Sequence, residues 1–201
     1  MAALPVVSAL GAALSAAARI LKDTDRSWAI VGALAVSART EPRFTRDIDV
    51  AVAVADDADA EAVVRAFTER LYVVFSVVEQ DATHRLATAR LSAVAAPGDA
   101  SVIVDLLFAS SGIEREIAEQ AETLEVLPGI DVPVTRTGHL LALKVLARSD
   151  ARPQDAADIQ ALLKVLDAEE RTRALEAGRL ILSRGFARGK DLPSEIARLF
   201  V

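Results

Sequence analysis

The sequence of 201 residues contains no cysteine, only two histidines and few aromatic residues. The lack of cysteine excludes disulfide bonds, a thiol nucleophile and a zinc–thiolate site. Neither His84 nor His139 has another candidate ligand at the spacing of a metal site. We therefore predict that His84 lies at the surface near the start of a strand and that His139 is an ordinary residue near the start of a helix. Trp28 and the phenylalanines are predicted to lie in the core rather than to stack on bases.

Positive charge and long apolar runs are also scarce. The formal net charge of −6 argues against a protein that coats nucleic acid or binds membrane surfaces in general, although it allows a local basic patch. No apolar run is long and free enough of charge to form a transmembrane helix. Residues 1–23 lack the basic residues that precede the apolar stretch of a signal peptide, so we predict an amphipathic helix there and a cytoplasmic protein.

The order of sequence patterns predicts an α/β fold. More than half of the residues are apolar, which is enough to bury a sizeable core. The patterns predict strands at 27–32, 47–54, 72–80, 84–94 and 101–109, a turn at 95–100, helices at 56–71 and 112–124, and a hairpin at 124–136. Further helices are predicted at 137–149, 153–166, 168–182 and 191–200. We therefore predict an α/β core over residues 1–136 and a helical part over residues 137–201.

Three carboxylates stand out in the predicted strands. Asp47 and Asp49 open the strand at 47–54, and side chains two residues apart on a strand point to the same face. Two neighbouring carboxylates repel each other, and a divalent cation between them removes that cost. Asp105 lies within the apolar run 101–109 and would join them if the two strands were neighbours. Mg²⁺, with Mn²⁺ as an alternative, suits carboxylates together with substrate phosphates.

Each of these residues also has a simpler interpretation. Two aspartates at the start of a strand are often only a solvated strand end. A buried Asp105 could instead be paired with an arginine such as Arg85 or Arg90.

The residues before the two aspartates favour the metal site. Gly32 ends a predicted buried strand, and the segment that follows it resembles the start of a helix. Backbone N–H groups at the start of a helix bind anions, and a glycine there lets a phosphate approach the chain closely. Arg43 and Thr45 then precede Asp47. A phosphate-binding turn and candidate metal ligands thus follow each other closely in the sequence.

The segment VGALAVSARTEPRFTRDIDVAV resembles nucleotidyltransferases of the DNA polymerase β superfamily, and it is most similar to the AbiEii-like toxins of type IV toxin–antitoxin systems. The segment VIVDLLF resembles the strand that carries the third aspartate of the superfamily. Residues 138–163 resemble a helical segment of the AbiEii-like group, with Lys144, Asp155 and Asp158 at the matching positions. Two residues depart from the pattern: Ala33 replaces a second glycine or serine, and Gln154 stands where a basic residue is common.

The resemblance implies a mixed-sheet nucleotidyltransferase core followed by helices, and an enzyme that uses an NTP. It implies Mg²⁺ held by Asp47, Asp49 and Asp105, with Lys144 and Asp158 also catalytic. The implied nucleotide contacts are Gly32, Ala33, Arg43, Thr45, Lys144 and Asp155. A tRNA 3′ end is the implied acceptor, and a cognate antitoxin is an expected partner. The alternatives are nucleotidylation of a protein or small molecule, and a non-catalytic member of the fold that binds a nucleotide or a partner.

The second block of the resemblance also has structural interpretations. Lys144 has the apolar helical neighbours Leu140, Leu141 and Ala147, so it either reaches the surface along them or contacts a triphosphate. Asp155 could simply complement the dipole at the start of a helix, and Asp158 could orient Lys144. A basic cluster near the C-terminus could hold an NTP or RNA, or be a solvated turn; it comprises Arg179, Arg184, Arg188 and Lys190.

Overall fold

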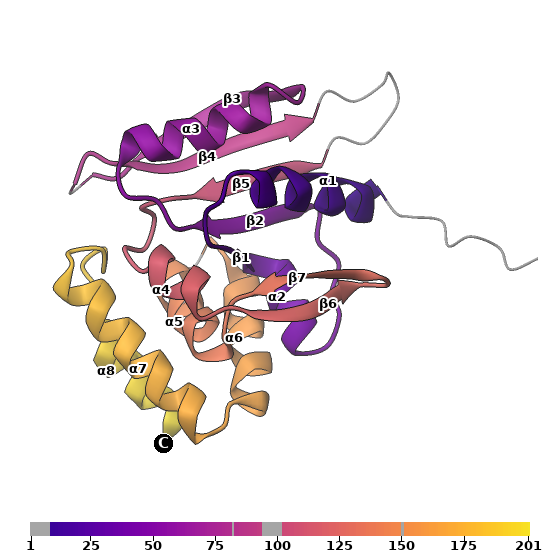
Figure 1. Cartoon of the computed structure of the whole chain (residues 1–201). Helices are drawn as coiled ribbons and strands as arrows, with labels where there is room; N and C mark the ends of the chain where they lie inside the picture. Colours follow the sequence, from indigo (N-terminus) through magenta and orange to yellow (C-terminus); the bar gives the residue numbers. More distant parts are fainter. Residues whose placement is uncertain (1–8, 82, 94–101, 150) are drawn as a thin grey trace, which may run out of the picture.

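The computed structural model describes residues 9–81, 83–93, 102–149 and 151–201, which form a mixed sheet surrounded by helices (Figure 1). The sheet has the strand order β3-β4-β5-β2-β1-β7-β6. Its strands are β1 (Trp28–Val31), β2 (Asp47–Val52), β3 (Tyr72–Glu79), β4 (Leu86–Ala93), β5 (Ile103–Leu107), β6 (Glu122–Leu127) and β7 (Ile130–Val134). The α/β fold class with a mixed sheet is confirmed.

The helices follow the predicted order closely. They are α1 (Ala9–Asp23), α2 (Gly32–Arg39), α3 (Asp57–Thr68), α4 (Glu114–Glu119), α5 (Thr137–Ala147), α6 (Pro153–Val165), α7 (Ala168–Ser183) and α8 (Leu192–Ala197), and a short 3-10 helix follows at Arg198–Phe200. The helix α3 packs against β3 and β4, whereas α5 contacts α2, α6, α7 and α8. The predicted turn at 95–100 and the first residues of the predicted N-terminal helix lie outside the described residues.

The central strands place the carboxylates. The strand β1 is antiparallel to β2, and β2 is parallel to β5, so the two aspartate-bearing strands are neighbours, as the grouping of Asp105 with Asp47 and Asp49 requires. Within β2 the buried residues Ile48 and Val50 alternate with Asp47 and Asp49. This alternation sends the apolar side chains into the core and both carboxylates to the opposite face.

One apolar core connects the sheet with the C-terminal helices. It includes Ile48 and Leu106 of the sheet together with Leu140 of α5 and Ile159 of α6. The predicted boundary at residue 137 coincides with the first residue of α5. The division into two subdomains at this residue remains a prediction.

Two aromatic residues depart from the sequence analysis. Trp28 and Phe67 are buried as predicted, but Phe44 is 78% exposed and Phe75 is 54% exposed. Phe44 lies in the loop between α2 and β2, where the guanidinium of Arg46 stacks 5.3 Å from its ring centroid. Phe75 lies at an irregularity on β3, an edge strand with no further strand to cover it. Both residues lack the regular, covered environment that buries an aromatic side chain.

His139 lies in the first turn of α5, as predicted. It is not an ordinary surface residue, however, because its side chain is buried. Burial lowers the pKa of His139 from 6.5 to about 4, and the nearby Arg173 acts in the same direction. The carboxylates of Glu170 and Glu116 oppose this shift. The folded protein therefore holds His139 in its neutral form.

We expect this histidine to weaken the fold in mild acid. The unfolded chain accepts a proton on His139 below pH 6.5, whereas the folded protein accepts it only near pH 4. The contribution of His139 to stability is therefore unchanged above pH 6.5, and it becomes unfavourable by up to about 3 kcal/mol as the pH drops towards 4. Urea unfolding of His139→Gln should show a smaller loss over this range than the wild type.

Candidate active site

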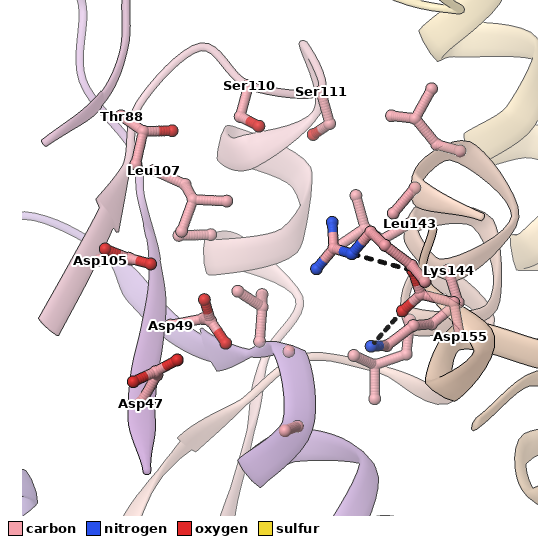
Figure 2. Close-up of a pocket in the computed structure, with 18 of the residues that line it drawn as sticks. Asp47, Asp49, Thr88, Asp105, Leu107, Ser110, Ser111, Leu143, Lys144 and Asp155 are labelled. Carbon is pink, nitrogen blue, oxygen red and sulfur yellow. Dashed lines mark hydrogen bonds and ion pairs between the residues drawn. The ribbon is translucent and has the colours of Figure 1, made fainter. Parts of the chain in front are cut away.

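Asp47, Asp49 and Asp105 lie on the same side of the sheet and face a cavity of about 730 Å³ (Figure 2). The parallel register of β2 and β5 places Asp49 directly beside Asp105, and Asp47 beside Ile103. Across the cavity, Lys144 on α5 and Asp155 on α6 face the carboxylates (Figure 2). The cavity therefore lies between the sheet and the C-terminal helices.

The cavity wall contains nearly all of the residues singled out in the sequence. Those that line it are Gly32, Ala33, Arg43, Thr45, Asp47, Asp49, Asp105, Lys144 and Asp155. Asp158 is the exception, because it does not line the cavity and lies behind Lys144, with which it forms an ion pair. The fold thus gathers residues that are more than a hundred positions apart in the sequence.

Gly32 forms the junction between β1 and α2, in direct contact with the carboxylate of Asp49. Its φ of +64° lies in the left-handed region that glycine adopts at little cost. A Cβ added at Gly32 would lie 2.6 Å from Asp49 Cγ, which is inside van der Waals contact. Glycine is therefore required twice at this position, by the backbone conformation and by the neighbouring carboxylate.

Gly32→Ala should destabilise the fold more than an alanine at another glycine with positive φ. Gly129 has a φ of +75°, and an added Cβ there would meet nothing within 4 Å. Both variants pay the backbone strain of about 1–2 kcal/mol, but only Gly32→Ala also displaces Asp49, which adds about 1–3 kcal/mol. Urea unfolding measures the difference. If the free energy of unfolding falls equally in the two variants, Asp49 is free to move aside.

Asp49 is costly to ionise in its present surroundings. Burial, together with the charges of Asp105 and Asp47, raises the pKa of Asp49 to about 6, although Lys144 and Arg152 oppose the shift. No described residue forms an ion pair with Asp47 or Asp49. A divalent cation bound between Asp47 and Asp49 would therefore reduce the repulsion between their carboxylates, which no ion pair of the described residues reduces.

Asp105 has a partner that Asp47 and Asp49 lack. Its two oxygens accept hydrogen bonds from Arg90, with Nε to Oδ1 at 2.7 Å and Nη2 to Oδ2 at 2.6 Å. Arg85, the other arginine considered in the sequence analysis, pairs with Asp57 instead. Over the described ranges, no three acidic or histidine side chains are arranged to hold a metal ion.

Lys144 is the centre of a buried ion-pair network, so it does not reach the surface along its apolar neighbours. Its Nζ lies 2.9 Å from Asp155 Oδ1 and 2.7 Å from Asp158 Oδ2, and both carboxylates are 2% exposed. Arg43 Nη2 donates to Asp158 Oδ2 at 2.8 Å, and Arg152 Nε lies 3.4 Å from Asp155 Oδ2. The network joins the loop before β2 to α5 and α6, and it fixes Lys144 at the cavity wall.

The basic cluster near the C-terminus does not act as a unit. Lys190 donates to three carbonyl groups at the end of α5, those of Val145, Leu146 and Arg148, and so caps that helix. Arg184 pairs with Glu116, and Arg179 is exposed on α7. Only Arg188 reaches the cavity, where its Nη2 donates to the Ser110 carbonyl at 3.2 Å.

Sequence reasoning missed several residues of the cavity wall. Arg152, Ser110, Ser111 and Glu114 all line the cavity. Glu114 Oε1 accepts hydrogen bonds from the backbone N–H and the hydroxyl of Ser111. Arg152 lies within the matched segment 138–163, just before α6. Glu114 is the first residue of the short helix α4, and the two serines lie in the bend before it, where no local pattern indicates a site.

Comparison with known proteins gives a family and a fold. The family described as "Nucleotidyl transferase AbiEii toxin, Type IV TA system" matches residues 16–200. No curated protein matches the sequence. Within the described residues, no helix has the length and apolar character needed to cross a membrane.

The chain is also similar to solved structures. The antibiotic-resistance factor ANT(2″)-Ia is 18% identical with a TM-score of 0.50, over 94% of this chain and 94% of that one. A candidate nucleotidyltransferase from Thermotoga maritima, TM1012, is 16% identical with a TM-score of 0.48, over 76% and 91% of the two chains. JHP933 from Helicobacter pylori is 12% identical with a TM-score of 0.46, over 96% and 90%.

Proposed function

The chain belongs to the AbiEii family of nucleotidyltransferase toxins of type IV toxin–antitoxin systems, and we propose that it transfers an NMP from an NTP to a hydroxyl group of RNA, at the 3′ end of a tRNA. The observation that carries the proposal is the pair Asp47 and Asp49, which faces the cavity beside the Gly32 turn and has no ion-pair partner among the described residues. A cognate antitoxin protein is part of the same proposal.

The donors present suit a divalent metal ion. Asp47 and Asp49 would hold Mg²⁺, or Mn²⁺ in its place, because hard cations prefer carboxylate oxygens and both side chains face the cavity with no ion-pair partner among the described residues. The ion would neutralise charge on the triphosphate and acidify the attacking hydroxyl. Asp105 belongs to the same group of carboxylates and would be a third ligand and an acceptor for the hydroxyl proton.

The chain itself supplies the phosphate contacts. Gly32 and Ala33 open α2, where the first backbone N–H groups have no partner within the helix. These groups can bind phosphate oxygens although Ala33 offers no hydroxyl. Lys144 and Arg43 add positive charge from the cavity wall, and Asp155 and Asp158 hold Lys144 in place. Thr45 also lines the cavity, two residues before Asp47 in the sequence, and would be a further contact to the nucleotide.

The charges on the far side of the cavity favour an anionic acceptor. Arg188 reaches the cavity without a carboxylate partner among the described residues, and its backbone φ of +54° is strained. Glu114 lies beside the Ser110–Ser111 turn, and its carboxylate already accepts two hydrogen bonds from Ser111. A phosphodiester backbone suits this wall better than a small cationic molecule.

The experiment that tests the proposal uses each NTP labelled at the α-phosphate, Mg²⁺ and total cellular RNA, with products separated on a gel. We expect label on a tRNA-sized band for the wild type and no label for Asp47→Ala/Asp49→Ala. Label on protein or on a small molecule would replace the RNA acceptor with one of the alternatives. NTP binding without any labelled product would indicate a non-catalytic member of the fold.

A further inference from the structure

Arg90 binds Asp105, the carboxylate that would be the third ligand of a metal ion held by Asp47 and Asp49. It lies on β4, directly across from Asp105 in the antiparallel pairing of β4 and β5. Both carboxylate oxygens of Asp105 are bound by this one guanidinium, in the two-pronged geometry that gives strong charge-assisted hydrogen bonds. A carboxylate held in this way has little capacity left for a metal ion.

The pair is built so that the arginine, and not the aspartate, can move. The side chain of Asp105 is 7% exposed on a central strand, whereas that of Arg90 is 45% exposed and lines the cavity. Arg90 is therefore the counter-ion of Asp105, and its exposed side chain has room to move.

A triphosphate offers Arg90 an alternative partner. The planar guanidinium fork fits phosphate oxygens as well as carboxylate oxygens. A nucleotide placed between the Gly32 turn and Lys144 would bring phosphate oxygens into the cavity that Arg90 also lines.

We propose that Arg90 is a positioning residue that holds Asp105 away from the divalent ion until an NTP enters the cavity, and that it then exchanges Asp105 for the phosphates. This inference rests on the proposed function, because it assumes that Asp47 and Asp49 bind the ion. Without NTP the protein has two carboxylates available for a cation, and with NTP it has three.

Mn²⁺ titration without NTP, followed by the electron paramagnetic resonance signal of the free ion, tests the exchange. We expect Arg90→Gln to bind Mn²⁺ at least about tenfold more tightly than the wild type, because Asp105 becomes a free ligand. Arg85→Gln is the matched control, since it removes the same charge from an arginine paired with Asp57. Adding Asp105→Asn to Arg90→Gln should cancel the gain.

A second measurement covers the case in which Arg90→Gln weakens the fold by leaving the buried Asp105 unpaired. Mn²⁺ should then raise the Tm of Arg90→Gln by several degrees more than that of the wild type. Equal Mn²⁺ affinity and equal Tm shifts in the two proteins would overturn the inference, as would a gain that persists in Arg90→Gln/Asp105→Asn.

Failure of the proposed metal site has a separate signature. If Asp47→Asn/Asp49→Asn binds Mn²⁺ as the wild type does, the assignment of the metal to this pair is wrong, and the role of Arg90 falls with it. If that variant loses Mn²⁺ while Arg90→Gln is unchanged, the metal site stands and only the role of Arg90 is wrong.

Discussion

Asp49→Asn should abolish nucleotide transfer, by a factor of at least about a thousand, and at the same time make the folded protein more stable. The amide keeps the shape of the side chain beside Gly32 but cannot supply the negative charge that the metal ion needs. Loss of a metal ligand removes several kcal/mol of stabilisation from the transition state, and about 4 kcal/mol corresponds to a thousand-fold. Asp131→Asn on β7 is the control, since Asp131 is exposed and does not line the cavity.

The gain in stability follows from the raised pKa of Asp49, which is 3.8 in the unfolded chain and about 6 in the folded protein. Both states are protonated below pH 3.8. Between pH 4 and 6 the unfolded chain ionises first, so the wild type loses stability as the pH rises, and above pH 6 the whole cost remains. Asparagine carries no such cost, and because Asp49 is partly accessible we expect a gain of about 1–2 kcal/mol.

Thermal unfolding in buffers without divalent ions checks this expectation. The Tm of Asp49→Asn should equal that of the wild type near pH 4 and exceed it by several degrees above pH 6. Adding Mg²⁺ should raise the Tm of the wild type and close the gap. An Asp49→Asn protein that is less stable than the wild type at pH 8 would show that the carboxylate makes contacts that offset its burial.

The second large effect concerns Lys144. Lys144→Met should destabilise the protein by about 3–5 kcal/mol and also abolish transfer, because removal of one partner leaves buried charge uncompensated. Asp155 and Asp158 would each lose their shortest ion-pair contact, and both are almost inaccessible to water. The exposed Lys164 on α6 is the control, and Lys164→Met should change neither property.

A triple variant separates the structural role of Lys144 from its role in transfer. Lys144→Met/Asp155→Asn/Asp158→Asn removes the lysine together with the two charges that it neutralises. We expect urea unfolding to show that at least half of the lost stability returns, while the labelled-NTP assay shows no return of transfer. Recovery of transfer in the triple variant would mean that Lys144 serves only to neutralise the two aspartates.

The carboxylate face of the site was predictable because it rests on local rules. Alternation along a strand determines that Asp47 and Asp49 share a face, and a glycine between a strand and a helix indicates a tight turn. Lys144 and Asp158 were noticed because each is a charge among apolar residues at helical spacing. In these cases the sequence neighbours of the residue carry the information.

The other face depends on contacts between distant segments. Arg85 and Arg90 were equal candidates for Asp105, and only the register between β4 and β5 selects Arg90. Arg188 looks like any arginine in a glycine-rich turn until the turn after α7 is placed beside Ser110. Phe44 was assigned to the core because composition cannot show that a loop leaves it exposed.

The cap on α5 has a consequence for the point during synthesis on the ribosome at which the toxin can become active. Lys190 holds the C-terminal end of α5, the helix that carries Lys144, and it is synthesised long after the strands that carry the aspartates. Such contacts between distant segments form late in folding. A nascent chain that has emerged only as far as α6 would hold its three aspartates and its lysine, yet the last turn of α5 would be unsecured. Harmful activity would therefore begin only once the segment around Lys190 has been synthesised and has docked.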